Sequence, residues 1–210
     1  SASDKRKAVA AAVVAAGALM ASGAAQAGVD VDNSTITIKS NDKNRKTIEL
    51  GFNNINIGTD ANTYRNEGNN VVSHDAIAIG TNATGTGDKA VAIGKGANAT
   101  KENGVAIGFS ATNQSIDSVA IGREATSSKD MDVAIGKQAQ ATGGESLAFG
   151  SQSKASGQAT IAVGKESNAS GSSAVAAGYQ SAAAGDNAVA VGKNTTAGAT
   201  NAIAVGLRAT

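Results

Sequence analysis

The chain of 210 residues contains no cysteine, no proline and no tryptophan. Without cysteine it has no disulfide, no Cys-based zinc site and no thiolate for catalysis. Aromatic residues are 2% of the sequence, so a globular core built around large side chains is not expected. Without proline, the 26 glycines fit neither a collagen-like chain nor a Pro-rich disordered segment. The glycines are therefore expected to serve a regular structure.

The sequence also lacks an excess of charge of either sign. Its 18 basic and 17 acidic residues give a formal net charge of +1. This balance supplies no bulk electrostatic attraction to nucleic acid or to an anionic membrane. We predict no nucleic-acid partner and no direct membrane contact.

The first 27 residues have the three parts of a secretory signal peptide. A basic cluster at residues 5–7 precedes an apolar run from Ala8 to Ala21, and Ala25-Gln26-Ala27 has the small-x-small pattern of a cleavage site. The run is shorter than the ~20 residues that a membrane-spanning helix needs. We expect secretion across the inner membrane, with cleavage after Ala27.

The rest of the chain is dominated by a glycine that recurs every 14 residues. An alanine lies two residues before each of these glycines, between two residues that are mostly Val or Ile. The repeated glycines are Gly80, Gly94, Gly108, Gly122, Gly136, Gly150, Gly164, Gly178, Gly192 and Gly206. No insertion or deletion interrupts the series, which predicts a stacked repeat architecture.

Each repeat predicts two short strands and two turns. The apolar run that ends in glycine is typical of a buried strand, and small residues three and five positions beyond the glycine predict a second one. Seven positions beyond the motif glycine, a further glycine recurs where a turn needs positive φ or a close backbone approach. These turn glycines are Gly87, Gly143, Gly157, Gly171 and Gly185. The pattern predicts an all-β parallel solenoid of 14-residue coils, about 4.8 Å apart.

The first strand of each coil is apolar on both faces, because side chains alternate along a strand. We favour Val and Ile inside the coil, packed against the small residues of the second strand, although the reverse assignment also fits. A strand that is apolar on both faces needs cover on both, and one coil supplies only one cover. The simplest second cover is another copy of the chain.

The repeat Ser118–Gly122 (SVAIG), followed by Ala125 and Ser127, resembles the head repeat of the YadA-like trimeric autotransporter adhesins of Gram-negative bacteria. The resemblance covers ten copies, residues 75–210. It implies a left-handed parallel β-roll, a homotrimer, display at the outer membrane and adhesion to host matrix proteins such as collagen, fibronectin and laminin, with autoagglutination. It implies no enzymatic activity and no cofactor.

The chain also departs from that family. It contains no neck, coiled-coil stalk or barrel anchor, so we interpret it as an N-terminal fragment. The first motif position, often Asn in the family, varies here, with Asn187 and Asn201 as the clearest matches. Ligand specificity is therefore not carried over.

Residues 28–74 precede the repeats and are expected to cap the first coil. Residues 34–39 and 46–50 alternate with period two, which predicts exposed strands. The Asn- and Gly-rich stretch from Asn53 to Asn70 predicts a turn or loop.

A candidate ligand stripe follows directly after the motif glycines, because stacked coils would align these positions. Its residues are Lys95, Phe109, Arg123, Lys137, Lys165, Tyr179 and Lys193. Such a stripe fits an acidic or extended ligand. Repeated lysines are equally what a soluble solenoid needs to keep its exposed edges apart.

No catalytic or metal site is predicted. His74 is the sole histidine and is expected in a solvated loop. Residues 85–90 imitate a dinucleotide fingerprint but open no predicted helix, so they are interpreted as turn glycines. Two other functions remain open: a secreted solenoid that binds ice or glycan without trimerising, suggested by a Thr- and Asn-rich ladder, and a self-associating surface-layer protein. The ladder consists of Thr84, Asn98, Thr112, Thr126, Asn168 and Thr196.

Overall fold

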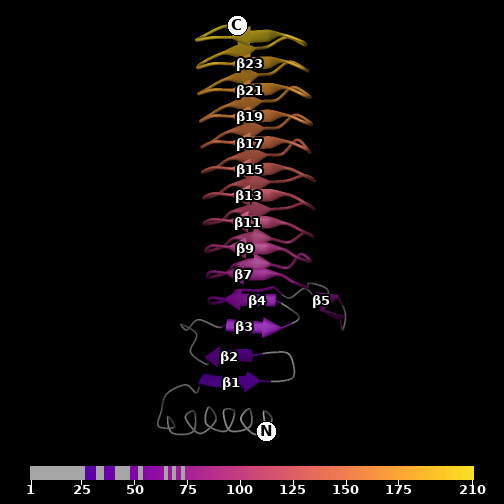
Figure 1. Cartoon of the computed structure of the whole chain (residues 1–210), viewed down its shortest axis with the longest axis vertical. Coiled ribbons are helices and arrows are strands. Elements are labelled where there is room, and N and C mark those ends of the chain that lie inside the picture. Colours follow the sequence, from indigo (N-terminus) through magenta and orange to yellow (C-terminus); the bar gives the residue numbers. More distant parts are fainter. Residues whose placement is uncertain are drawn as a thin grey trace, which may run out of the picture.

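The computed structural model describes residues 27–31, 36–40, 48–51, 54–63, 66–67, 70–71 and 74–210, and it describes side chains at 54–63 and 74–210. Residues 1–26 of the expected signal peptide lie outside the described residues, and Ala27 is the first residue of strand β1 (Ala27–Val31). From residue 74 onward the chain is an uninterrupted stack of coils (Figure 1).

Each repeat coil contributes one strand to a first sheet and, except for the last coil, one strand to a second, and these strands pair in parallel, as predicted. The first sheet takes the three-residue strands β7 (Ile77–Ile79), β9 (Val91–Ile93), β11 (Val105–Ile107), β13 (Val119–Ile121), β15 (Val133–Ile135), β17 (Leu147–Phe149), β19 (Ile161–Val163), β21 (Val175–Ala177), β23 (Val189–Val191) and β25 (Ile203–Val205). The second takes the two-residue strands β8 (Thr84–Gly85), β10 (Asn98–Ala99), β12 (Thr112–Asn113), β14 (Thr126–Ser127), β16 (Gln140–Ala141), β18 (Lys154–Ala155), β20 (Asn168–Ala169), β22 (Ala182–Ala183) and β24 (Thr196–Ala197).

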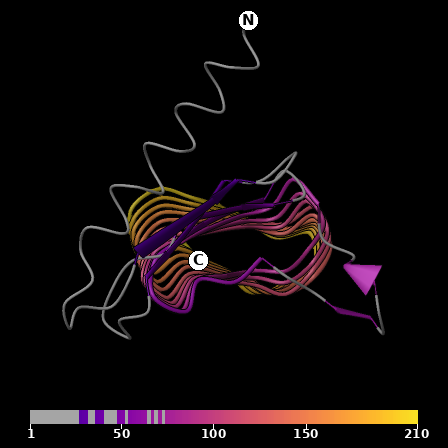
Figure 2. The ribbon, with the colours of Figure 1, turned by 90° about the horizontal axis from the view of Figure 1, so that it is seen from below.

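Neighbouring coils pair in exact 14-residue register. Ala120 pairs with Ala106 below and with Ala134 above, and Thr126 of the second sheet pairs with Thr112. Seen along the stack, the coils superpose into one flattened outline (Figure 2). A shift of one residue would turn every inward side chain outward, which explains why the period has no insertion.

The interior is filled by small side chains, so the favoured placement of Val and Ile inside the coil is wrong and the reverse assignment holds. In the coil of Gly122 the inward residues are Ser118, Ala120, Ala125 and Ser127, and all four are fully buried. The two sheets lie close together: a Cβ on Gly85 would lie in van der Waals contact with the Cβ of Ala92 on the facing sheet, at 3.6 Å. The aliphatic neighbours of each alanine therefore point outward.

All ten motif glycines are required by conformation, and all but Gly206 also by the close approach of the next coil. Their φ angles lie between 123° and 138°, a region that L side chains rarely adopt. The glycines seven positions further on have no positive φ. A Cβ on Gly143 would instead overlap the carbonyl oxygen of Gly157 one coil above. Of the two reasons predicted for these turn glycines, close backbone approach is the correct one.

Before the repeats, three antiparallel strands extend the first sheet. Strands β1, β2 (Ile36–Ser40) and β3 (Ile48–Gly51) pair in chain order, and β3 pairs with β4 (Asn54–Ile57). The strands predicted at residues 34–39 and 46–50 correspond to β2 and β3. Their predicted exposure concerns side chains outside the described ones. A separate hairpin joins β5 (Asn66–Glu67) and β6 (Asn70–Val71).

The turn or loop predicted from Asn53 to Asn70 is wrong at residues 54–57 and 66–67, which form strands β4 and β5. Strand β4 pairs in parallel with β7, setting Asn56 beside Ala78, and Gly58 has the motif glycine conformation with φ 135°. Residues 54–63 therefore form one more rung of the stack. The 14-residue pattern did not predict this rung, because Asn56 replaces the motif alanine and 22 residues, not 14, separate Gly58 from Gly80.

Candidate functional site

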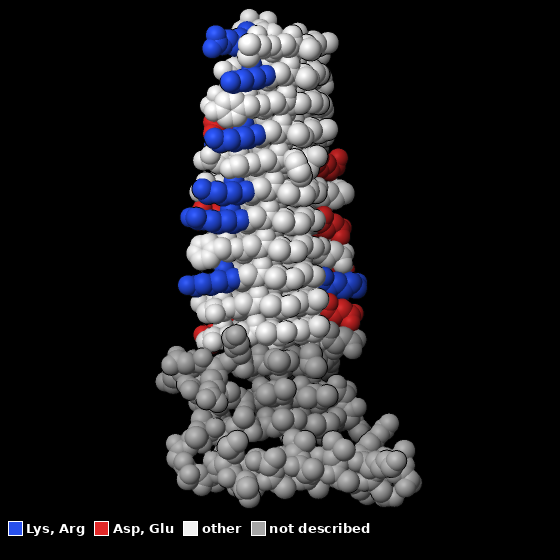
Figure 3. Space-filling model, turned by 60° about the vertical axis from the view of Figure 1, so that its left-hand side comes forward, with Lys and Arg blue, Asp and Glu red and all other residues white. Residues whose placement is uncertain are grey.

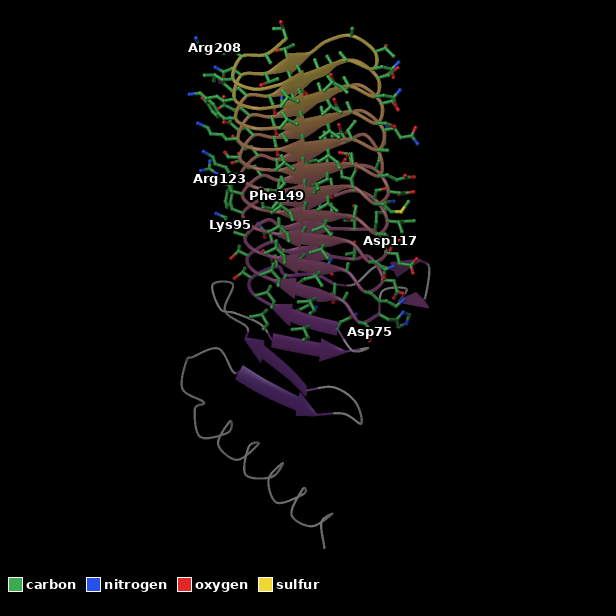
Figure 4. The ribbon with its side chains drawn as sticks, turned by 45° about the horizontal axis from the view of Figure 1, so that its top comes forward. Asp75, Lys95, Asp117, Arg123, Phe149 and Arg208 are labelled. Atoms are coloured by element: carbon green, nitrogen blue, oxygen red, sulfur yellow. The ribbon has the colours of Figure 1, made fainter. Side chains whose placement is uncertain are left out.

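The seven residues of the predicted ligand stripe are brought together on one narrow edge of the solenoid. All of them are exposed, and each lies in the turn that joins the first strand of its coil to the second. Figure 3 shows Lys and Arg side chains in a column along this edge, and Figure 4 places Lys95, Arg123 and Arg208 on it. We name this surface the basic edge. Its basic residues are Lys95, Arg123, Lys137, Lys165, Lys193 and Arg208.

Backbone hydrogen bonds between coils fix the spacing of the basic edge. The amide of Glu124 donates to the carbonyl of Phe109 at 2.8 Å, and the amide of Gln138 donates to that of Arg123 at 2.8 Å. The same bond recurs along the turn from coil to coil. Equivalent positions of neighbouring coils are therefore held one strand spacing apart, about 4.8 Å.

Two acidic residues, Glu124 and Glu166, lie within the basic edge and are tied to their neighbours. Gln138 donates to Glu124 at 2.7 Å and Arg123 donates to it at 3.0 Å. These hydrogen bonds lower the pKa of the Glu124 carboxyl. Glu166 repeats the arrangement with Gln180 at 2.7 Å and Lys165 at 3.2 Å, which lowers its pKa as well. Both carboxylates are charged at neutral pH and partly compensate the positive charge of the basic edge.

Tyr179 lies between two cations of the same edge. The ammonium groups of Lys165 and Lys193 are 5.5 Å and 5.6 Å from its ring centroid. Both distances lie within the range of a cation–π attraction. The aromatic ring therefore restricts two long side chains that would otherwise move independently in solvent.

The opposite edge carries charge of the other sign. It is the turn that leads from each second strand to the next coil, and its acidic residues are Asp75, Asp88, Glu102, Asp117, Asp130, Glu145 and Asp186, against Lys89, Lys101 and Lys129. Figure 4 places Asp75 and Asp117 there. We name this surface the acidic edge.

The two broad faces differ in polarity. The outward residues of the first sheet are aliphatic or aromatic, apart from Ala177, and several are well exposed in the single chain, such as Phe149 at 50% and Ile161 at 41%. The outward residues of the second sheet include the Thr- and Asn-rich ladder, which Gln140, Lys154 and Ala182 interrupt. We name the first of these surfaces the apolar face.

One coil has a buried carboxylate in place of a small inward residue. Asp132 is fully buried and accepts hydrogen bonds from the amides of Lys129, Gly144 and Ser146 at 2.9, 2.9 and 3.1 Å, and from the Ser146 hydroxyl at 2.6 Å. Buried charge is tolerated when several donors surround it. The residue thus has a structural role.

His74 and residues 85–90 are the described positions whose sequence could suggest a catalytic or phosphate-binding site. His74 is exposed, and its amide and ring nitrogen face Asp88, which the amide reaches at 2.9 Å. No group of three His, Cys, Asp or Glu side chains in this part of the chain could hold a metal ion. Residues 85–90 run from β8 through a turn and open no helix. Nor does the described part contain a helix long and apolar enough to cross a membrane.

A left-handed residue in each of the two turns of a coil was not predicted from the sequence. One lies two positions after the motif glycine, as in Glu124 with φ 57°, and the other five before it, as in Asn187 with φ 55°. Asn and Asp tolerate this conformation best. Their recurrence at the second position, which includes Asn187 and Asn201, is the signal that could have revealed it.

Comparison with known proteins agrees with this geometry. The model of the YadA head domain repeat matches residues 73–97, 86–111, 114–139, 127–153, 141–167, 155–181, 169–195 and 183–209. The crystal structure of the collagen-binding domain of Yersinia adhesin YadA is 32% identical, with a TM-score of 0.52, covering 56% of this chain and 65% of that chain. No curated protein matches. The chain belongs to the YadA head domain repeat family of non-enzymatic adhesin heads.

Proposed function

We propose that the chain is the head of a trimeric adhesin on the surface of a Gram-negative bacterium, and that it attaches the cell to collagen and related host matrix proteins. The apolar face is the observation that carries this proposal. It runs the length of the coil stack, and its side chains include Ile161 and Val163, which are 41% and 36% exposed in the single chain. An exposed apolar surface of that extent marks a protein interface.

A second and third copy of the chain are the partners that fit this face best. The face repeats with the period of the coils, so a copy in the same register matches it along its whole length. Closed three-fold symmetry covers all three faces with one repeated interface and leaves none exposed. Similarity to the YadA head supports this assembly.

Collagen is the favoured ligand because the related solved structure is a collagen-binding domain. A rigid rod offers the same surface at every coil, and three copies multiply it. Linked weak contacts raise the overall affinity without any single strong site. Adhesion by avidity therefore suits a surface built of repeats.

The assembly is tested by placing charge on the apolar face. Ile121→Asp together with Ile135→Asp should convert the trimer into a folded monomer, because two buried carboxylates per chain would lie uncompensated at the interface. Thr126→Asp with Gln140→Asp is the matched control, since these residues point outward from the second sheet of the same coils. Loss of the trimer in both double variants, or in neither, would contradict the assignment of the interface.

Adhesion is tested separately by solid-phase binding to fibrillar collagen, fibronectin and laminin. The wild-type chain should bind collagen, and the monomeric double variant should bind it at least about 100-fold more weakly through loss of avidity. A stable trimer that binds none of the three proteins would refute the matrix-adhesion function while leaving the assembly intact.

A further inference from the structure

The charges of the two edges differ in what they do for the fold. On the acidic edge, Asp88 accepts from the amide of His74 at 2.9 Å, and Asp186 accepts from that of Ser172 at 2.9 Å. Asp130 accepts from Ile116 in the same way at 3.3 Å. Each of these residues satisfies a backbone donor of the coil below. Three of the seven acidic residues of this edge are therefore explained by the stacking of the coils.

The basic edge has no such explanation. Among the described side chains, Lys95, Lys137 and Lys193 form no ion pair, in contrast to Arg123 and Lys165. Lys137 lies near enough to Glu124 to lower its pKa, but no salt bridge joins them. Arg208 forms no ion pair with a described side chain either, so four exposed cations per chain remain uncompensated along one line.

That line is straight, rigid and long. Seven coils separate Lys95 from Lys193, which corresponds to roughly 34 Å along the stack. Cations recur along it at intervals of one or two coils, or roughly 5 and 10 Å. Tyr179 restricts the last two of them, Lys165 and Lys193, on either side of its ring. A pre-organised row of charges loses less entropy when it binds a stiff partner.

We propose that the basic edge binds a linear sulfated polysaccharide, which lies along the rod with its sulfate groups on Lys95, Lys137, Lys193 and their basic neighbours. Sulfate keeps its charge at every physiological pH and suits the point charge of a lysine ammonium group. The Gln side chains of the same turns, among them Gln152, offer hydrogen bonds to sugar hydroxyls. This binding goes beyond adhesion to matrix proteins, and a single chain already carries the complete row.

Single-stranded nucleic acid fits the same edge less well. Proteins that bind it combine cations with aromatic platforms on which successive bases stack. Phe109 and Tyr179 are five coils apart, roughly 24 Å, so the row has no continuous platform. The favoured ligand is therefore the saccharide.

The test measures binding of the purified chain to immobilised heparin over a range of salt concentrations. Replacing Lys95, Lys137 and Lys193 with glutamine should weaken binding roughly 100-fold, from about a fivefold loss per lysine near a polyanion. The slope of log K against log salt should also become shallower by about 2, since each lysine that is removed no longer displaces a counterion from the polyanion on binding. Replacing Lys89, Lys101 and Lys154 removes the same charge elsewhere and should change binding less than about threefold.

Three results would overturn the assignment: equal losses in the two triple variants, equal binding to chemically desulfated heparin, or equally tight binding to a homopolymer of deoxythymidine. Chain mass and collagen binding are recorded on the same samples. Heparin binding by a chain that fails to trimerise or to bind collagen would remove the adhesin function and leave the saccharide site standing. The opposite pattern would remove only the saccharide site.

Discussion

The substitution Gly122→Ala adds one methyl group between two stacked coils and so tests how closely the coils must approach. Gly122 has φ 128°, and an added Cβ would lie 2.6 Å from the carbonyl carbon of Gly136 in the coil above. Both the conformation and the contact are unfavourable for any residue other than glycine. Neither can relax without moving backbone that is hydrogen-bonded on both sides, since the Gly122 amide donates to Ile107 and that of Gly136 to Ile121.

The expected cost is the sum of these two effects. Backbone strain in a sparsely populated region costs about 1–3 kcal/mol. Overpacking of a tight interior costs about 1–3 kcal/mol more. We expect the free energy of unfolding to fall by about 4 kcal/mol, with the damage concentrated in the coils that flank Gly122, because a solenoid transmits defects mainly to its nearest neighbours.

Gly198→Ala is the matched control. Gly198 has no φ in the left-handed range, and a Cβ added there would meet no heavy atom within 4 Å. The free energy of unfolding of this variant should rise by less than about 1 kcal/mol, because alanine restricts the unfolded chain. Urea unfolding followed by circular dichroism gives the free energies, and native-state hydrogen exchange locates the loss. Equal unfolding midpoints for the two variants would refute the role assigned to the motif glycine.

Three further predictions concern single residues. Asp132→Ala should lower the free energy of unfolding by about 3 kcal/mol, because three backbone amides lose their acceptor; Glu102→Ala, at an exposed position without a left-handed φ, should change it by less than about 0.5 kcal/mol, and equal losses would contradict the buried network. Ala159→Asn should raise stability by about 0.5 kcal/mol, since φ is 53° and Asn tolerates the left-handed region better than Ala; a loss on urea titration would argue against that conformation. The amide of His74 lowers the pKa of Asp88 below 3.8, so its stabilising contribution is complete above about pH 4 and is lost as the pH falls through the folded-state pKa. Asp88→Asn should therefore show a smaller fall in melting temperature between pH 5 and pH 2 than the wild type, and an unchanged fall would exclude this contribution.

The periodic features of the fold were predictable because each depends on one residue type. The 14-residue spacing of the motif glycines fixed the coil length, and the alternation around Ala120 fixed which residues share a face of the strand. The pattern did not decide which face is inside, because both faces are apolar. That choice depends on the distance between the two sheets, which favours Ala- and Ser-sized groups and which no single strand encodes.

Departures from the repeat were harder to predict for a related reason. Strand β4 forms a coil although Asn56 stands where the motif has alanine, because parallel pairing with β7 tolerates the change. The left-handed turn residues include Met131 and Ala159, which carry no conformational signal of their own. The surrounding hydrogen bonds impose the conformation, so only stacking reveals it.

The alignment of the basic-edge residues could be predicted from the sequence, but the contacts between their side chains could not. Stacking alone aligns Lys95 with Lys193 on one edge. Sequence spacing gave no sign that Tyr179 contacts two lysines, or that Glu124 is bound by Gln138 one coil above. These contacts depend on side-chain reach across neighbouring coils, and they decide which cations remain uncompensated.

The most direct test is the mass of the chain in solution, measured by sedimentation equilibrium. Outward-facing Val and Ile side chains require sister copies to cover them, so three 20.4-kDa chains should sediment as one particle of about 61 kDa. A mass of 20.4 kDa at micromolar concentration, with the β-sheet circular dichroism spectrum retained, would show that the apolar face stays uncovered and would contradict the trimeric assembly.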